Sequence, residues 1–177
     1  LFYVVLAPFV GAFADAQPKG RVMFFSNAIK VVGCLMMLFG SHPLMAYAIV
    51  GLGAAAYSPA KYGILTELLP TSKLVAANGW IEGLTITSII LGVVLGGQLV
   101  GDKISPHLLA FDFPFIDTGI DSAPEAAIAS ILVVYVVAAF FNLFIPHTGV
   151  TLIPVQKNPL DTMADFMVCN RRLWQDR

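Results

Sequence analysis

Apolar residues in this chain are gathered into long blocks that short polar segments separate. The long blocks cover residues 22–40, 44–69, 74–100 and 126–145, and a shorter one covers residues 1–14. A helix needs about 20 apolar residues to cross the roughly 30 Å hydrocarbon core of a bilayer. The pattern therefore predicts four membrane-spanning helices, preceded by a partial helix that is too short to span.

The polar segments differ in charge, and this difference predicts how the spans are oriented. If residues 15–21 lie in the cytoplasm, alternation of the spans puts residues 70–73 and 146–177 on the same side. These segments hold most of the basic residues: Lys19, Arg21, Lys73, Lys157, Arg171, Arg172 and Arg177. Residues 102–124 fall on the opposite side, where Lys103 lies among acidic residues. Because cytoplasmic loops carry the excess of Lys and Arg, we predict a periplasmic loop at 102–124 and a cytoplasmic segment at 146–177.

The segment 146–177 also contains a helix start. Asn158, Pro159 and Asp161 fit an N-cap, a first helical position and an acidic first turn. The apolar residues that follow recur near one face: Leu160, Met163, Met167 and Trp174. We predict an amphipathic helix that lies against the bilayer or the protein; a partly ordered linker is the alternative.

Composition supports a membrane protein and argues against other classes. The mean hydropathy is +0.81 and 12% of the residues are charged, whereas soluble domains carry about a quarter charged residues. Cys34 and Cys169 do not suggest a disulfide framework, and the histidines fall in predicted loops without the spacing of metal ligands. We therefore expect no metal, no cofactor, no catalytic site and no nucleic-acid partner.

The loop between the first two apolar runs has an informative spacing. Residues 11–21 read Gly-Ala-Phe-Ala-Asp-Ala-Gln-Pro-Lys-Gly-Arg. This resembles the loop signature that the major facilitator superfamily carries between transmembrane helices 2 and 3, with Gly11, Asp15, Gly20 and Arg21 at its fixed points. The basic residue that usually follows the aspartate is absent, and the spacing to Gly20 is stretched. The resemblance implies a gating loop that contacts neighbouring helices; a charged turn that only fixes topology is the alternative.

A second stretch is more specific. Residues 51–67 read Gly-Leu-Gly-Ala-Ala-Ala-Tyr-Ser-Pro-Ala-Lys-Tyr-Gly-Ile-Leu-Thr-Glu, and residues 72–79 read Ser-Lys-Leu-Val-Ala-Ala-Asn-Gly. They resemble the fourth and fifth helices of bacterial lysophospholipid transporters, and the likeness runs through about residues 1–101. It implies an all-α membrane protein with the major facilitator fold, in which two halves are built from inverted three-helix repeats. This chain would supply the N-terminal six-helix half, from a partial helix 2 through helix 6, plus the start of the central cytoplasmic loop.

The same resemblance implies a function. Such transporters move lysophospholipids across the bacterial inner membrane toward the cytoplasm, where an acyltransferase re-acylates them. The implied partners are the lysophospholipid substrate, membrane lipids, a separate or fused acyltransferase, and the C-terminal half of the same transporter. The chain begins inside an apolar run without a methionine, so we expect it to be a piece of a longer protein.

Three ionisable residues fall inside the predicted spans: Lys30, Lys61 and Glu82. A charge near the bilayer centre costs about 2.5 to 3.5 kcal/mol on insertion scales, so such residues line a path or pair with one another. Lys61 and Glu82 each lie about ten residues from the turn at 70–73, which puts them at matched depth at about 1.5 Å per residue. Two cations and one carboxylate leave one positive charge for an anionic substrate group.

We predict that Lys61 meets the substrate, with Tyr57 beside it, because the fourth helix lines the central cavity in the superfamily that the chain resembles. Glu82 shares a helix face with Asn78, and we predict that both belong to the substrate site. Glu82 would either carry an ion or neutralise Lys61. The alternative is a Lys61–Glu82 ion pair that only holds two helices together. For Lys30 we expect snorkelling to the surface or a partner outside this chain.

Two further expectations concern packing. Glu67 lies near the end of its span and is expected to be a solvated helix terminus. The glycines at positions 92, 96, 97 and 101 have the spacing of small residues that allow close helix packing.

Two other functions share parts of this pattern. A major facilitator carrier for a drug, a sugar or another small molecule has the same composition and differs only in residues 51–82. A membrane lipid acyltransferase commonly carries a His-x-x-x-x-Asp pair. His107 and Asp112 have that spacing, but they fall in the predicted periplasmic loop, away from acyl donors. A purely structural subunit would not need Lys61 and Glu82 at matched depth, so we predict a transporter and not an enzyme.

Overall fold

The described part of the chain is helical. The computed structural model describes residues 2–101, 103–109, 120, 122–146, 148–150 and 159–175, and these residues form no strand. The helices are α1 (Phe2–Asp15), α2 (Lys19–Leu38), α3 (Pro43–Leu68), α4 (Thr71–Val100), α5 (Ser105–Leu109), α6 (Ala123–Asn142) and α7 (Pro159–Gln175). Among them, α2, α3, α4 and α6 are long and apolar enough to cross a membrane. The prediction of an all-α membrane protein is therefore confirmed.

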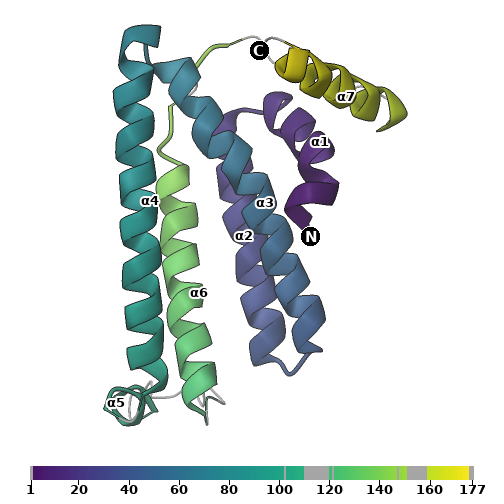
Figure 1. Cartoon of the computed structure of the whole chain (residues 1–177). Helices are drawn as coiled ribbons and strands as arrows, with labels where there is room; N and C mark the ends of the chain where they lie inside the picture. The colour runs from purple at the N-terminus through teal and green to yellow at the C-terminus, as the bar shows by residue number, and fades with distance from the viewer. Residues whose placement is uncertain are drawn as a thin grey trace.

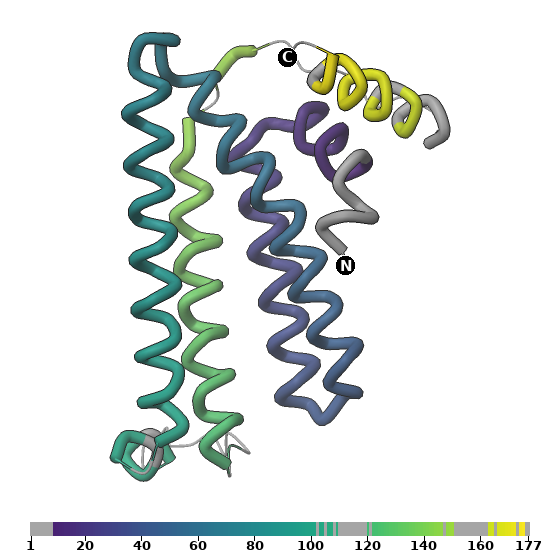
Figure 2. The backbone as a smooth tube through the Cα atoms, viewed as in Figure 1, coloured from purple at the N-terminus to yellow at the C-terminus, as the bar shows by residue number. Residues whose placement is uncertain are grey.

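The long helices run up and down in an antiparallel series (Figures 1 and 2). The first two, α2 and α3, form a hairpin, and α6 packs between this hairpin and α4. The loop at 16–18, the turn at 69–70 and residues 143–146 and 148–150 lie at one end of the bundle, where α7 also lies. We call this end the α7 end. The predicted cytoplasmic segments are thus at one end, whereas α5 and the described parts of the predicted loop 102–124 are at the other.

Several helix ends differ from the ends of the apolar runs. α2 begins at Lys19, three residues before the apolar run at Val22, directly after Pro18. α6 begins at Ala123, where Ser122 and Glu125 form a capping box. The capping box satisfies free N–H groups in the first turn of α6, whereas no side chain caps the start of α2. Neither helix therefore starts where its apolar run starts. Most of the predicted loop 102–124 lies outside the described residues.

The tightest packing in the bundle joins α2 to α3, and glycine makes it possible. A Cβ on Gly33 would lie 2.5 Å from Val50 Cγ2, and a Cβ on Gly53 would lie 2.6 Å from the Ser26 carbonyl oxygen. Small residues of this kind allow two membrane helices to approach closely. The α4 glycines were expected to allow close helix packing. No described helix of this chain packs against them in that way, because Gly92, Gly96 and Gly97 have no described atom within 4 Å of an added Cβ.

The outward faces of the long helices are apolar. No described residue of α4 is buried, and Val75, Trp80 and Val93 are 84%, 75% and 73% exposed. A continuous apolar surface of this size would drive association in water, whereas lipid tails match it in a bilayer. The chain is therefore part of a multi-pass membrane protein.

The last helix, α7, lies across the α7 end and contacts α1 (Figure 1). Its Phe166, Met167 and Trp174 side chains are exposed. The side chain of Leu160 and the predicted N-cap Asn158 lie outside what the structure describes. A helix therefore forms in the predicted segment 146–177, with an exposed apolar face.

Candidate functional site

An open cavity of about 630 Å³ lies between α2, α3, α4 and α6. Its cationic lining residues are Lys30 from α2 and Lys61 from α3, and no described acidic residue lines it. The rest of the lining is aromatic, hydroxylic or aliphatic: Tyr57, Tyr135, Ile81, Leu84, Thr85, Ser88 and Ile89. The four helices thus bring two lysines to one space, within segments that are apolar enough to span a membrane.

Lys61 is half-buried and reaches across from α3 to α4. Its Nζ donates a hydrogen bond to Thr85 Oγ1 at 3.0 Å. The Thr85 hydroxyl in turn donates to the Ile81 carbonyl at 2.7 Å, one turn earlier on α4. The Lys61 ammonium also lies 4.6 Å from the centroid of the Tyr62 ring. A hydroxyl and a ring face orient the cation but do not neutralise it.

Lys30 is buried, at 9% exposure, and points into the same cavity. Its Nζ lies 4.5 Å from the centroid of the Tyr57 ring and 5.2 Å from that of Tyr135. Its hydrogen-bond partner is Asn27 Oδ1, at 3.2 Å. Lys30 therefore does not snorkel to the surface, whereas a partner outside this chain stays a prediction. Gly53 explains the difference, because its missing side chain leaves room beside the Lys30 stem, whose Cγ would be 2.9 Å from an added Cβ.

Glu82 lies near Lys61 but does not pair with it in the described part of the chain. Glu82 Oε2 accepts a hydrogen bond from the Tyr62 hydroxyl at 2.7 Å, and the ion pairs that form involve Lys19 instead. The alternative of a Lys61–Glu82 ion pair is thus not the arrangement found. Asn78 is exposed on α4 and does not line the cavity. Of the predicted substrate residues, the structure brings Lys61 and Tyr57 together and leaves Glu82 and Asn78 at the side.

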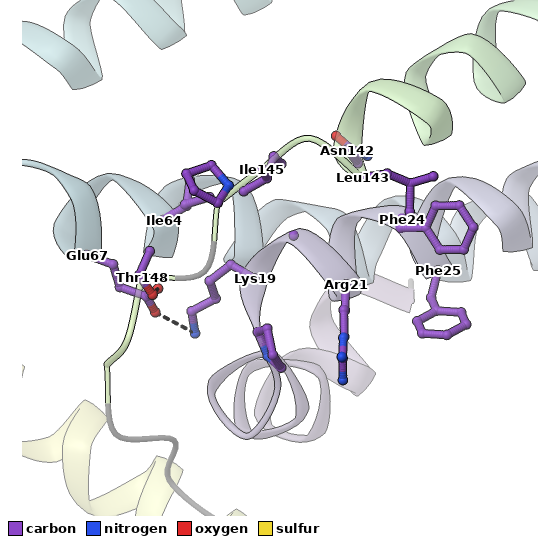
Figure 3. A pocket seen from close by; sticks show the side chains of 13 residues that line it. Lys19, Arg21, Phe24, Phe25, Ile64, Glu67, Asn142, Leu143, Ile145 and Thr148 are labelled. Carbon is purple, nitrogen blue, oxygen red and sulfur yellow. Dashed lines mark hydrogen bonds and ion pairs between the residues drawn. The ribbon is translucent and has the colours of Figure 1, made fainter.

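A second polar cluster lies at the α7 end and is centred on Lys19 (Figure 3). Lys19 is 6% exposed. Its Nζ lies 2.6 Å from Asp15 Oδ1 and 3.8 Å from Glu67 Oε1, and it donates to the Ala14 carbonyl at 2.9 Å. The other Glu67 oxygen accepts a hydrogen bond from the Thr148 hydroxyl at 2.6 Å. The cluster therefore links α1, α2, α3 and the segment after α6.

The residues that match the superfamily loop signature have different surroundings. Asp15 belongs to the Lys19 cluster. Gly20 lies against the segment after α6, since an added Cβ would be 3.0 Å from Ile145 Cβ. Arg21 is exposed, and Gly11 has no described atom within 4 Å of an added Cβ. The expectation that Glu67 is a solvated terminus is wrong, because its side chain is 14% exposed and held by Lys19 and Thr148.

Three of the residues that shape these sites were not predicted from the sequence. Tyr135 belongs to an apolar run with no local signal, and it reaches Lys30 only because α6 packs on α2. Lys19 was assigned to a loop, and Thr148 lies past the last span. Only Lys19 had a usable signal, which was its place four residues after Asp15. Within the described residues, no group of His, Cys, Asp and Glu side chains has a geometry that could hold a metal ion.

Comparison with known proteins identifies a family and a set of similar relatives. The family model of the Major Facilitator Superfamily matches residues 1–161. The chain is 42% identical over 174 residues to proteins named lysophospholipid transporter LplT from Yersinia pestis (strain Pestoides F) and Yersinia pseudotuberculosis serotype O:3 (strain YPIII). These matches cover 98% of this chain and 38% of each relative, so the chain spans well under half of their length. No solved structure matches the chain significantly.

Proposed function

The chain belongs to the major facilitator superfamily, and we propose that it is part of the N-terminal half of a carrier that moves lysophospholipids across the bacterial inner membrane toward the cytoplasm. The names of its relatives, which are lysophospholipid transporters, support this substrate. In this proposal the α7 end faces the cytoplasm, because α2 and α4 begin there and their first turns hold Lys19, Arg21 and Lys73. The protein would act as a transporter and not as an enzyme.

One observation carries the proposal: two lysines line one cavity within the spans, and no described acidic residue lines that cavity with them. A cation inside a membrane costs free energy unless a partner compensates it. A lysophospholipid offers that partner, because its phosphate is anionic and its acyl chain matches the apolar faces of the surrounding helices. A neutral sugar would leave both lysines without a counter-ion.

We assign Lys61 as the principal phosphate contact, with Thr85 holding its ammonium in place. Tyr57 lines the cavity together with both lysines and presents its ring to Lys30. Lys30 is added to this site as a second cation that raises the positive potential of the cavity. Glu82 and Asn78 remain proposed members at its edge, where Glu82 is held by Tyr62.

The proposed gating loop consists of Gly11, Asp15, Gly20 and Arg21. Asp15 would act through Lys19, which also reaches Glu67. Gly20 would keep the start of α2 close to the segment after α6. In this proposal the Lys19 cluster fixes one arrangement of the α7 end, and its opening accompanies transport.

The remaining partners follow from the same proposal. A carrier needs the C-terminal half of the superfamily fold to complete the cavity. An acyltransferase, separate or fused, would convert the delivered lysophospholipid to a diacyl lipid. Membrane lipids surround the apolar faces that the helices expose.

The test uses the full-length protein in bacterial cells or spheroplasts that lack their own lysophospholipid uptake. Labelled lysophosphatidylethanolamine is supplied, and its conversion to diacyl lipid is followed for the wild type and for Lys61→Ala at matched expression. We expect conversion by the wild type and its loss in the variant. Equal conversion by both would reduce Lys61 to a structural cation. No conversion by correctly inserted wild type would leave a carrier for another substrate, such as a drug or a sugar.

A further inference from the structure

The helix α7 has one apolar face. Counted from Met163, large apolar residues recur after three, four and eleven residues, a spacing that puts them on one side of a helix. They are Phe166, Met167 and Trp174, whose side chains are 45%, 62% and 68% exposed. None of the four lines the cavity between the spans or a smaller cavity of about 440 Å³ around the first turn of α2 (Figure 3). This apolar face is therefore separate from the proposed substrate site.

The position of α7 turns this face toward the membrane. α7 lies across the α7 end, transverse to the long helices, and it contacts α1, which lies on the side of α7 that faces the middle of the bundle (Figures 1 and 2). Among the described side chains of α7, Met163 is half-buried and the others are exposed. Since Met163 belongs to the apolar face, that face is the one directed toward the bundle, at the level where the spans end.

Most of the apolar face extends beyond the contact with α1. The 17 residues of α7 give a length of about 25 Å at 1.5 Å per residue. Within the described residues, the bundle shields Met163 and leaves Phe166, Met167 and Trp174 exposed. Exposed apolar side chains at the level of a membrane surface are stabilised when acyl chains cover them.

Two arginines accompany the apolar face. Arg171 follows Met167 by four residues, so it lies at the edge of the face, and Arg172 lies on the polar side. Both side chains are exposed, and neither forms an ion pair with a described residue. A bilayer surface offers acyl chains to the apolar stripe and anionic headgroups to the arginines beside it. An amphipathic helix with this combination is typical of helices that lie in the membrane interface.

We propose that α7 docks in the interface of the leaflet at the α7 end, and that its partner is a bilayer surface that contains anionic phospholipids. Phe166, Met167 and Trp174 enter at the level where headgroups meet acyl chains. Arg171 and Arg172 bind the phosphate groups of neighbouring lipids. The docking depends on the lipid surface and not on the transported substrate.

The first test uses the full-length protein in lipid vesicles, with a fluorophore attached to opposite faces of α7. Cys169 is exposed and follows Met167 by two residues, about 200° around the helix. One sample carries the label on the native Cys169, and the other carries it on Met167→Cys combined with Cys169→Ser, with the remaining cysteines replaced in both. We expect nitroxide-bearing lipids to quench the label at position 167 and iodide in the water to quench the label at position 169.

The second test varies the charge of the lipid. Vesicles of phosphatidylethanolamine with phosphatidylglycerol are compared with vesicles of phosphatidylethanolamine with phosphatidylcholine, and iodide quenching at position 167 measures the ratio of docked to undocked α7. Each basic residue near an anionic surface strengthens binding about fivefold. Arg171→Gln with Arg172→Gln should therefore lower the ratio about thirtyfold in the anionic vesicles and leave it unchanged in the neutral ones. Lys73→Gln, which removes an exposed cation of another helix at the same end, is the control and should change neither.

Three results would overturn the proposal. Equal iodide quenching of the two labels would mean that α7 lies in water. Protection of the label at position 167 from both iodide and nitroxide lipids would mean that protein covers the apolar face. Equal docking in anionic and neutral vesicles would exclude anionic lipids as the partner. The last comparison needs no arginine substitution, so a folding defect in the double variant leaves the lipid comparison to decide.

Discussion

The molecule places its membrane-embedded and near-membrane lysines in two kinds of surroundings. Lys19 is buried at the α7 end with two carboxylates, a carbonyl and a neighbouring hydroxyl in one cluster. Lys30 and Lys61 lie in the cavity between the spans, where they meet rings, an amide and a hydroxyl but no described carboxylate. Desolvation penalises all three, and only Lys19 is compensated within the described residues. We therefore interpret Lys19 as a charge that holds helices together, and Lys30 and Lys61 as charges that are available to a ligand.

The largest expected effect comes from reversing the charge of an available lysine. Lys61→Glu puts a carboxylate where the proposed phosphate binds, so repulsion is added to the lost contact. We expect uptake and conversion of labelled lysophosphatidylethanolamine to fall by about a hundredfold, or about 2.7 kcal/mol. The unfolding midpoint in detergent should stay unchanged. Lys73→Glu, an exposed position outside both cavities, is the control and should retain uptake.

At Lys19, whose charge is compensated by carboxylates, we expect the main effect on stability. Lys19→Met leaves Glu67 with Thr148 as its hydrogen-bonding partner and removes the bond to the Ala14 carbonyl. Hydrogen bonds to charged groups contribute about 1.5 to 3 kcal/mol, so we expect a loss of about 2 kcal/mol in the free energy of unfolding. Thermal unfolding of the detergent-solubilised protein measures it, with Lys73→Met as the exposed control. An unchanged midpoint would show that the cluster contributes nothing to stability.

The fold was predictable because apolar block length has one physical cause, the thickness of the bilayer. The same argument explains why Lys61 and Glu82 were expected at matched depth, and Tyr62 and Glu82 do meet across α3 and α4. Partners of a charge were not predictable, since they depend on which faces the helices turn toward one another. Lys30 is an example. Its side chain lies in the cavity and not at the lipid surface because Gly53 leaves room for its stem and because α6 places Tyr135, about a hundred residues away in sequence, beside its ammonium.

Lys30 sharpens the comparison, because it is more deeply buried than Lys61 yet has the weaker polar contact. Lys30→Met keeps the apolar stem and removes the cation from the rings of Tyr57 and Tyr135. We expect uptake to fall by about tenfold, or about 1.4 kcal/mol, with little change in unfolding. Lys30→Arg retains the charge and should recover part of the uptake. Wild-type uptake by Lys30→Met would mean that the aromatic residues hold Lys30 for packing alone.

The smallest expected effect comes from a variant that leaves Lys61 itself unchanged but gives it a carboxylate partner, as Lys19 has. The Tyr62 hydroxyl holds Glu82 Oε2 at 2.7 Å, and Lys61 lies beside the same ring. Tyr62→Phe releases the Glu82 carboxylate, which is then free to turn toward Lys61 and neutralise it. We expect uptake to fall about threefold, or about 0.6 kcal/mol. Adding Glu82→Gln to Tyr62→Phe removes the competing charge, so uptake should return to the level of Glu82→Gln alone. If the double variant is no better than Tyr62→Phe, the tyrosine acts on the cavity directly, and holding a carboxylate away from Lys61 is not its role.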